Sequence, residues 1–98
     1  GNALMFSRSI IPYVRSVKWE KWIETAVFHT HVGMYGYKAS TLREITRLPQ
    51  SPAEIAESLE QLRWLQNGYR IATALTDIPT VGIDTPEDLK RACATMGL

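Results

Sequence analysis

The sequence SPAEIAESLEQLRWLQNG, residues 51–68, carries the clearest helix signal in this chain. Ser51 stands at the capping position, Pro52 follows at the first helical position, and Glu54 comes three residues after the cap. Asn67-Gly68 is a typical helix stop. The apolar side chains recur at helical spacing as Ile55, Leu59 and Leu62, widened by Ala56 and Leu65. These signals predict one long amphipathic helix that buries its apolar stripe.

Extended segments are expected on both sides of this helix. Residues 31–37 (HVGMYGY) are aromatic and contain two glycines, and residues 70–75 form another candidate strand. Alternation along a strand sends four residues of the first segment to one face, namely His31, Gly33, Tyr35 and Tyr37. This face is polar and aromatic with a gap at Gly33, a shape that suits a ligand, although glycine in a strand equally marks a bulge.

The amino-terminal part predicts a further strand and two helices. Residues 3–6 are short, apolar and strand-like. The next helix is expected to bury both Trp19 and Trp22, on a stripe that consists of Trp19, Trp22, Ile23, Ala26 and Val27. Ser40 is then expected to cap a short helix that carries Leu42, Ile45 and Leu48.

The carboxy-terminal segment contains a second pattern typical of a helix start. Thr85-Pro86-Glu87-Asp88 resembles the earlier capping pattern, and Gly97 is expected to end this helix. Its inward side chains are predicted to be Leu89, Ala92, Cys93 and Met96. Strands therefore alternate with helices along the chain, which indicates an α/β layered fold. Because no repeat or linker is visible, residues 1–98 are expected to form a single domain.

Composition narrows the classes of function. The chain has 98 residues, of which 45% are hydrophobic and 21% charged, so a disordered chain is excluded. Eleven basic and ten acidic residues give a net charge of +1 without a basic block. We therefore expect neither a nucleic-acid nor a membrane partner. The single cysteine, Cys93, allows no internal disulfide and fits a cytoplasmic protein.

Some polar residues could carry chemistry, and each also has a simpler interpretation. His29 and His31 would face the same way in a strand, but no third metal ligand is near in sequence. His31 alone is either a structural histidine or, with Tyr35, a substrate contact. Glu57 and Gln61 are four residues apart and share a helical face. Together with Glu60, at the edge of the stripe, they predict a solvated face unless a ligand binds there.

Asp84 lies between Gly82-Ile83 and the helix start at Thr85. An aspartate at this place commonly complements the helix dipole. It could also offer a hard oxygen to Mg²⁺, which usually takes one or two protein carboxylates together with substrate phosphates. Spacing alone does not decide between these roles.

Three stretches, in this order and spacing, resemble the 3-deoxy-manno-octulosonate cytidylyltransferase family, the CMP-Kdo synthetases. They are residues 2–13 (NALMFSRSIIPY), residues 31–39 (HVGMYGYKA), and residues 58–63 (SLEQLR) leading to residues 82–89 (GIDTPEDL). The resemblance is weakest over residues 16–28. It implies the carboxy-terminal portion of a nucleotide-diphospho-sugar transferase-like three-layer fold, with a mixed sheet and flanking helices.

The resemblance also implies a reaction, in which the anomeric hydroxyl of Kdo attacks the α-phosphorus of CTP and pyrophosphate leaves. By similarity, Asp84 is a catalytic ligand of Mg²⁺. Six other residues would contact the sugar acid, namely Arg8, Arg15, His31, Tyr35, Glu60 and Gln61. A cytoplasmic homodimer is implied as well. Family members carry a CTP-binding loop and a second metal carboxylate without a counterpart here, so residues 1–98 alone are expected to be inactive.

Two other functions stay open on the sequence. One is a synthetase for another sugar acid, such as sialic acid. The other is a non-catalytic module that dimerises or binds a sugar.

Overall fold

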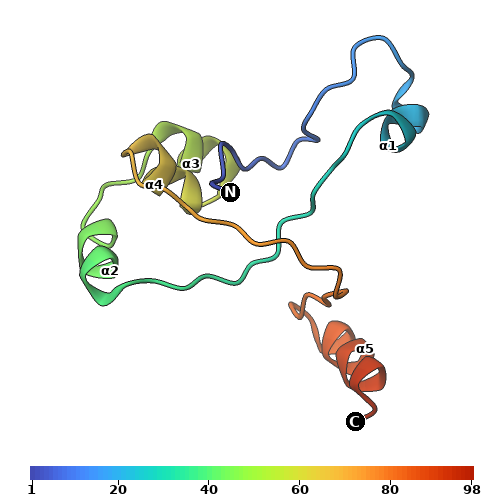
Figure 1. The fold of residues 1–98 in the computed structure, drawn as a ribbon. Coiled ribbons are helices and arrows are strands. Elements are labelled where there is room, and N and C mark those ends of the chain that lie inside the picture. Colours follow the sequence, from blue (N-terminus) through green and yellow to red (C-terminus); the bar gives the residue numbers. More distant parts are fainter.

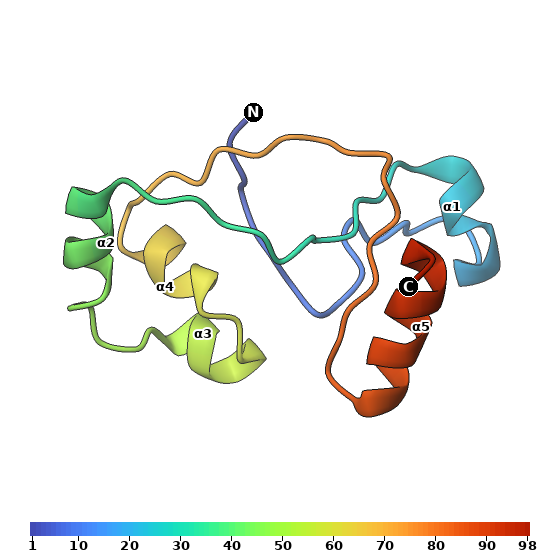
Figure 2. The same cartoon turned by 90° about the horizontal axis from the view of Figure 1, so that it is seen from below.

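The computed structural model describes residues 1–98 as short helices joined by long extended segments (Figure 1). In chain order the elements are η1 (Trp19–Lys21), α1 (Trp22–Thr25), α2 (Ala39–Ile45), α3 (Pro52–Glu57), α4 (Gln61–Gln66) and α5 (Pro86–Met96). Helices α2, α3 and α4 gather on one side, whereas α1 and α5 lie apart from them in both views (Figures 1 and 2). The radius of gyration is 16.6 Å, compared with about 13 Å for a compact chain of this length.

The mixed sheet expected from the sequence is not present, so this part of the fold prediction was wrong. The structure contains no strand, and its only β-bridge is an antiparallel one between Asn2 and Ala72. Two of the expected strands, residues 3–6 and residues 70–75, thus meet only near their beginnings. Residues 31–37 form no strand and pair with no other segment, and the Met34 amide donates to the Val32 carbonyl at 2.8 Å across Gly33.

The physical reason is that a strand depends on its neighbours. Around the bridge, the Ala3 amide donates to the Ile71 carbonyl at 2.9 Å and the Thr73 amide donates to the Gly1 carbonyl at 2.8 Å. Two such hydrogen bonds do not make a stable sheet, which needs several strands and a covered face. An alternating pattern of side chains indicates that a segment is suited to a sheet. It does not indicate whether a second strand lies beside that segment.

The helix predicted over residues 51–66 begins and ends as expected but is divided in the middle. The Ser51 hydroxyl accepts from the Glu54 amide at 3.4 Å, and the Glu54 carboxylate accepts from the Ser51 amide at 3.1 Å. Helix α3 ends at Glu57 because Ser58 adopts the left-handed conformation, with φ 52° and ψ 45°. Helix α4 then ends before Gly68, which has φ 83°.

The buried residues concentrate where α3 and α4 pack against each other and against the end of α2. Only 7 of the 98 residues are buried, so this region is the centre of the fold. Leu62 is the most completely buried side chain. The buried set consists of Ile45, Ser51, Glu54, Gln61, Leu62, Trp64 and Ala92.

The tryptophan helix is shorter and more exposed than predicted. Helix α1 ends before Ala26, whose backbone is extended. Trp22 is half-buried, since its indole N–H donates to the Val17 carbonyl at 2.9 Å and its ring stacks on Phe28. Trp19 is 71% exposed, so the prediction that both tryptophans are buried was wrong. An apolar stripe is buried only where another element covers it, and no sheet covers this one.

The predicted ends of the last helix are confirmed. Thr85 and Asp88 form a capping box, and Gly97 ends α5 in the left-handed conformation. Of the four side chains expected to point inward, only Ala92 is buried, while Leu89 and Met96 are exposed. This helix has 11 residues. No helix in the structure is both long and apolar enough to cross a membrane.

The second helix begins slightly earlier than predicted. Ser40 was expected to cap it, but Lys38 occupies the cap position and makes no side-chain capping bond. Ser40 therefore lies within the first turn of α2. Ile45 at its end is buried, as the predicted apolar face requires.

Candidate functional site

An aromatic cluster lies on one side of α4. It consists of Phe6, His31, Tyr35, Tyr37 and Trp64. The ring of Trp64 meets the rings of Tyr35 and Tyr37 edge-on, with centroids 5.6 and 5.5 Å apart. His31 Nε2 and the Tyr35 hydroxyl oxygen are 2.5 Å apart. The rings that alternation places on one face therefore do contact each other, although their segment is not a strand.

The two tyrosines of the aromatic cluster have pKa values above the ordinary value of tyrosine. Burial raises the pKa of Tyr35, and the neighbouring Tyr37 adds to the effect. Burial also raises the pKa of Tyr37, with a further contribution from the charge of Glu60. Both hydroxyls are protonated at neutral pH, as tyrosine ordinarily is, and can donate and accept hydrogen bonds.

Glu60, at the cap position of α4, lies beside Tyr37 and Trp64 of the aromatic cluster, and Gln61 is the first residue of the helix. The Glu60 side chain is 66% exposed, and its Oε2 lies 3.9 Å from Arg63 Nη2. Gln61 is buried, and its amide Nε2 has no hydrogen-bond partner. A buried donor without a partner costs roughly 1–3 kcal/mol. The start of α4 thus offers one accessible carboxylate and one unsatisfied amide donor.

Glu60 lies between two hollows in the surface. One, of about 350 Å³, is lined by Gln50, Glu54, Ile55, Ser58 and Glu60. The other, of about 110 Å³, is lined by Tyr37, Leu42, Ile45, Thr46, Glu60, Arg63 and Trp64. The residues around Glu60 are thus partly polar and partly aromatic, which suits a ligand with both hydroxyl groups and an apolar face.

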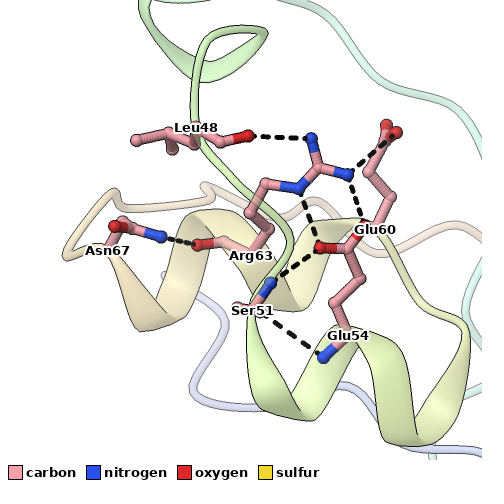
Figure 3. Close-up of polar contacts among 6 residues, drawn as sticks. All are labelled: Leu48, Ser51, Glu54, Glu60, Arg63 and Asn67. Atoms are coloured by element: carbon pink, nitrogen blue, oxygen red, sulfur yellow. Dashed lines mark hydrogen bonds and ion pairs between the residues drawn. The ribbon is translucent and has the colours of Figure 1, made fainter.

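An ion pair between Glu54 and Arg63 fixes α4 against α3 (Figure 3). Arg63 Nε donates to Glu54 Oε2 at 2.8 Å, and Arg63 Nη2 contacts the other carboxylate oxygen. Arg63 Nη1 donates to the Leu48 carbonyl at 3.4 Å. The hydrogen bond from Arg63 is the main reason that the pKa of Glu54 falls from 4.5 to about 2. This pair holds the turn from which Glu60 projects.

Sequence reasoning missed this pair because it assumed one continuous helix. Nine residues separate Glu54 from Arg63, which is about two and a half turns. The two side chains would then point in opposite directions. The break at Ser58 removes this obstacle. One signal could have revealed it, since Ser58-Leu59-Glu60-Gln61 has the pattern of a second helix start.

Arg8 lies at the same break. Its Nη2 donates to the Ser58 carbonyl at 3.0 Å, its Nε donates to the Glu57 carbonyl, and its backbone amide donates to Glu57 Oε2 at 2.6 Å. Glu57, at the end of α3, and Gln61, at the start of α4, therefore no longer share one helix. The structure thus brings Arg8, His31, Tyr35, Glu60 and Gln61 to the surroundings of α4.

Two predicted site residues lie elsewhere. Arg15 is exposed in the loop before η1. Asp84 is exposed before α5, where its backbone amide donates to Asp88 Oδ2 at 3.2 Å. This hydrogen bond is the main reason that the pKa of Asp88 is lowered. Helix α5 is separate from α3 and α4 in both views (Figures 1 and 2).

Asp84 offers one hard oxygen to a metal ion. No group of three or more histidine, cysteine, aspartate or glutamate side chains lies close enough to hold a metal. His29 and His31 accordingly have no third ligand. A single exposed carboxylate fits the small share that Mg²⁺ commonly takes from a protein when phosphates and water supply the remaining ligands.

Residues 1–71 match the family described as cytidylyltransferase. Since this match covers more than half of the chain, the protein belongs to the cytidylyltransferase family.

Curated relatives carry a more particular name. The chain is 56% identical over 94 residues to the 3-deoxy-manno-octulosonate cytidylyltransferase of Parabacteroides distasonis, covering 96% of this chain and 38% of the relative. It is 57% identical to the protein of that name from Phocaeicola vulgatus, covering 93% and 36%. For the one from Thermodesulfovibrio yellowstonii the identity is 46%, covering 94% and 36%. The chain thus spans little more than a third of these relatives' length.

Proposed function

We propose that the protein carrying this chain is a 3-deoxy-manno-octulosonate cytidylyltransferase, which joins CTP and Kdo to form CMP-Kdo and pyrophosphate. The observation that carries the proposal is the polar and aromatic site around α4, found in a chain 56% identical to a relative of that name. The site offers hydroxyl, amide and carboxylate groups side by side. These are the groups that recognise a polyhydroxylated acid.

The residues around α4 would bind and orient the sugar acid. The Glu60 carboxylate would accept from sugar hydroxyls, and the Gln61 amide would donate to a sugar oxygen once ligand binding uncovers its Nε2, which is buried in the structure. Arg8 has five N–H donors, and its bonds to the Glu57 and Ser58 carbonyls leave some of them for the carboxylate of the sugar. Transfer at phosphorus depends mainly on such positioning and on charge neutralisation.

His31 and Tyr35 would complete the sugar site, and Arg15 would join it if its loop moves inward. The close contact between His31 Nε2 and the Tyr35 hydroxyl fixes both groups relative to each other. A ligand hydroxyl that hydrogen-bonds to both is therefore oriented without further ordering of these side chains. Analogues without that hydroxyl should bind less well, because they leave a polar group unpaired.

Mg²⁺ is proposed as the metal, with Asp84 as one ligand. When bound, this ion neutralises part of the triphosphate charge. Asp84 must be exposed to reach a metal held mainly by substrate phosphates, and the structure leaves it exposed.

A homodimer in the cytoplasm is proposed as the working form. Many large apolar side chains are exposed on this chain, including Leu4 at 95% and Met34 at 86%. Apolar surface of this kind is covered either by the rest of the full-length protein or by a second copy. Sedimentation of the full-length protein tests the dimer, and fractionation of the cells that contain it tests the location.

The test of the activity is pyrophosphate release by the full-length protein with CTP, Mg²⁺ and one sugar acid at a time. We expect turnover with Kdo and little with sialic acid. A preference for sialic acid would assign a different synthetase. No turnover with either acid, together with binding of the sugar, would indicate a non-catalytic module.

A further inference from the structure

Glu57, the last residue of α3, attaches the amino-terminal segment to the helix break. The Ser7 hydroxyl oxygen lies 2.9 Å from each carboxylate oxygen of Glu57. The Arg8 amide donates to Glu57 Oε2 at 2.6 Å, and the Ser9 amide donates to Ser7 Oγ at 3.0 Å. One carboxylate thus holds two consecutive residues that lie about fifty positions away in the sequence, and Ser9 is attached through Ser7.

The Arg8 side chain closes the same junction from its other side. The last carbonyls of a helix have no partner within the helix. Arg8 satisfies two carbonyls at this place, those of Glu57 and Ser58. Glu57 therefore holds the backbone of Arg8 while the side chain of Arg8 binds the helix end. Both sets of contacts join residues that are about fifty positions apart in the sequence.

The break so stabilised determines where α4 begins. Ser58 is the only non-glycine residue with positive φ, a conformation that is unfavourable for residues with a Cβ atom. Its strain must be offset by contacts, and the contacts at this junction come from Arg8. Ser58 and Glu60 line the same hollow of about 350 Å³. The position of Glu60 and Gln61 consequently depends on the junction.

We propose that Glu57 is a positioning residue for the sugar-acid site. Its carboxylate is occupied by Ser7 and the Arg8 amide and so acts on the ligand only through them. It holds Arg8 against the break between α3 and α4. The Arg8 guanidinium and the start of α4 can then contact the same ligand. This inference rests on the proposed function for its catalytic consequence, but its structural part can be measured without catalysis.

The kinetic experiment uses the full-length protein with Glu57→Ala, Glu57→Gln and Ser7→Ala. Loss of the hydrogen bonds to a charged acceptor should raise the KM for Kdo about tenfold in Glu57→Ala. The KM for CTP should change by less than about twofold, because the proposal assigns this junction to the sugar acid and not to the nucleotide. Glu57→Gln keeps one accepting oxygen and should recover most of the affinity. Ser7→Ala should give a smaller rise in the same direction.

Glu24→Gln is the matched control. Glu24 is an exposed glutamate in α1 whose side chain pairs only with Lys21, at 3.2 Å. This substitution should leave both KM values unchanged. A merely structural role for Glu57 would lower kcat with both KM values unchanged, since fewer molecules would be folded. That result, or an equal rise of both KM values, would overturn the proposal.

Hydrogen exchange at the Arg8 amide gives a readout that needs no activity. The amide should exchange about tenfold faster in Glu57→Ala than in the wild type, because its acceptor is lost. An unchanged exchange rate would overturn the proposal whatever the kinetics show. If the wild type does not use Kdo, the proposed function fails, and the exchange rate alone then decides whether Glu57 holds the segment.

Discussion

Helices α3 and α5 both begin with a capping box, but α3 is packed against other helices and α5 is largely exposed. In α3 the Glu54 carboxylate accepts from the Ser51 amide, and in α5 the Asp88 carboxylate accepts from the Thr85 amide, both at 3.1 Å. Each carboxylate also pairs with an arginine. The pair in α3 is enclosed, with side-chain exposures of 6% for Glu54 and 15% for Arg63.

The pair in α5 is open to solvent on one side. Arg91 is 72% exposed and comes from the next turn of the same helix, three residues after Asp88. Arg63 instead reaches Glu54 from a different helix. The capping pattern thus fixes where a helix starts. The packing around the helix decides whether the carboxylate pairs with an arginine of another helix or with one of its own helix. Exposed pairs of this kind contribute little to stability.

The largest expected effect tests this contrast in the apolar side chains. Leu62→Ala, in α4, should lower the free energy of unfolding by about 2–5 kcal/mol, because Leu62 is 1% exposed. Leu89→Ala, in α5, should change it by less than about 1 kcal/mol, because Leu89 is 51% exposed. Urea denaturation of the full-length protein measures both. Equal losses would mean that another part of the full-length protein covers α5.

The second effect concerns the activity that depends on Asp84, the exposed residue before α5. Asp84→Asn should lower kcat roughly a hundredfold, as expected when a charged group that supports the transition state is removed. The free energy of unfolding should stay unchanged, because Asp84 is exposed. Asp77→Asn, at another exposed aspartate of the same loop, is the control and should keep full activity. Near-normal turnover of Asp84→Asn at saturating Mg²⁺ would restrict Asp84 to the role of a helix-end residue.

The third effect is a pH dependence of the free energy of unfolding, which should differ between the Glu54–Arg63 and Asp88–Arg91 pairs. The folded protein holds the pKa of Glu54 near 2, below its ordinary value of 4.5. A lowered pKa stabilises the fold fully above the ordinary value, and this stabilisation is lost as the pH falls from 4.5 toward 2. Unfolding measured across this range should therefore be less steep in Glu54→Gln than in the wild type. The pKa of Asp88 is lowered as well, first by the hydrogen bond from the Asp84 amide and then by the exposed Arg91, so the corresponding change in Asp88→Asn should be smaller.

The smallest effect compares the two caps directly. Ser51→Ala and Thr85→Ala should each cost about 1 kcal/mol of stability, since each removes one side-chain capping bond. Ser51 is buried and Thr85 is exposed, so the loss at Ser51 should be the larger of the two. Thermal unfolding of both variants provides the measurement. A larger loss at Thr85 would contradict the view that α3 and α4 form the stable centre.

Much of the candidate site could be predicted from the residues themselves, and the rest could not. The shared face of His31 and Tyr35 follows from a period of two, which holds in any extended chain. Glu60 is predicted beside the apolar stripe of one long helix, whereas the structure places it at the cap position of α4, after the break at Ser58. The pairing of Arg63 with Glu54 is not foreseen, because a continuous helix turns these two side chains apart. Trp64 is overlooked, although its spacing of four from Glu60 places both on one face of α4. The solvated face predicted for Glu57 is instead covered by Ser7 and Arg8, which come from a distant part of the chain.

The sequence by itself determined the features that depend on a few neighbouring residues. These are the helix starts at Ser51 and Thr85, the helix ends at Gly68 and Gly97, and membership of the cytidylyltransferase family. Caps and stops act over three or four positions, so their chemistry is complete within a short segment.

Only the tertiary structure decided the break at Ser58, the Glu54–Arg63 pair, the exposure of Trp19 and the absence of a sheet. Each of these depends on a group brought from far away in the chain or on the lack of one. Ser7 reaches Glu57 across fifty positions, while no segment pairs with residues 31–37. Local patterns state what a segment can form, and its neighbours in space determine which of those structures it adopts.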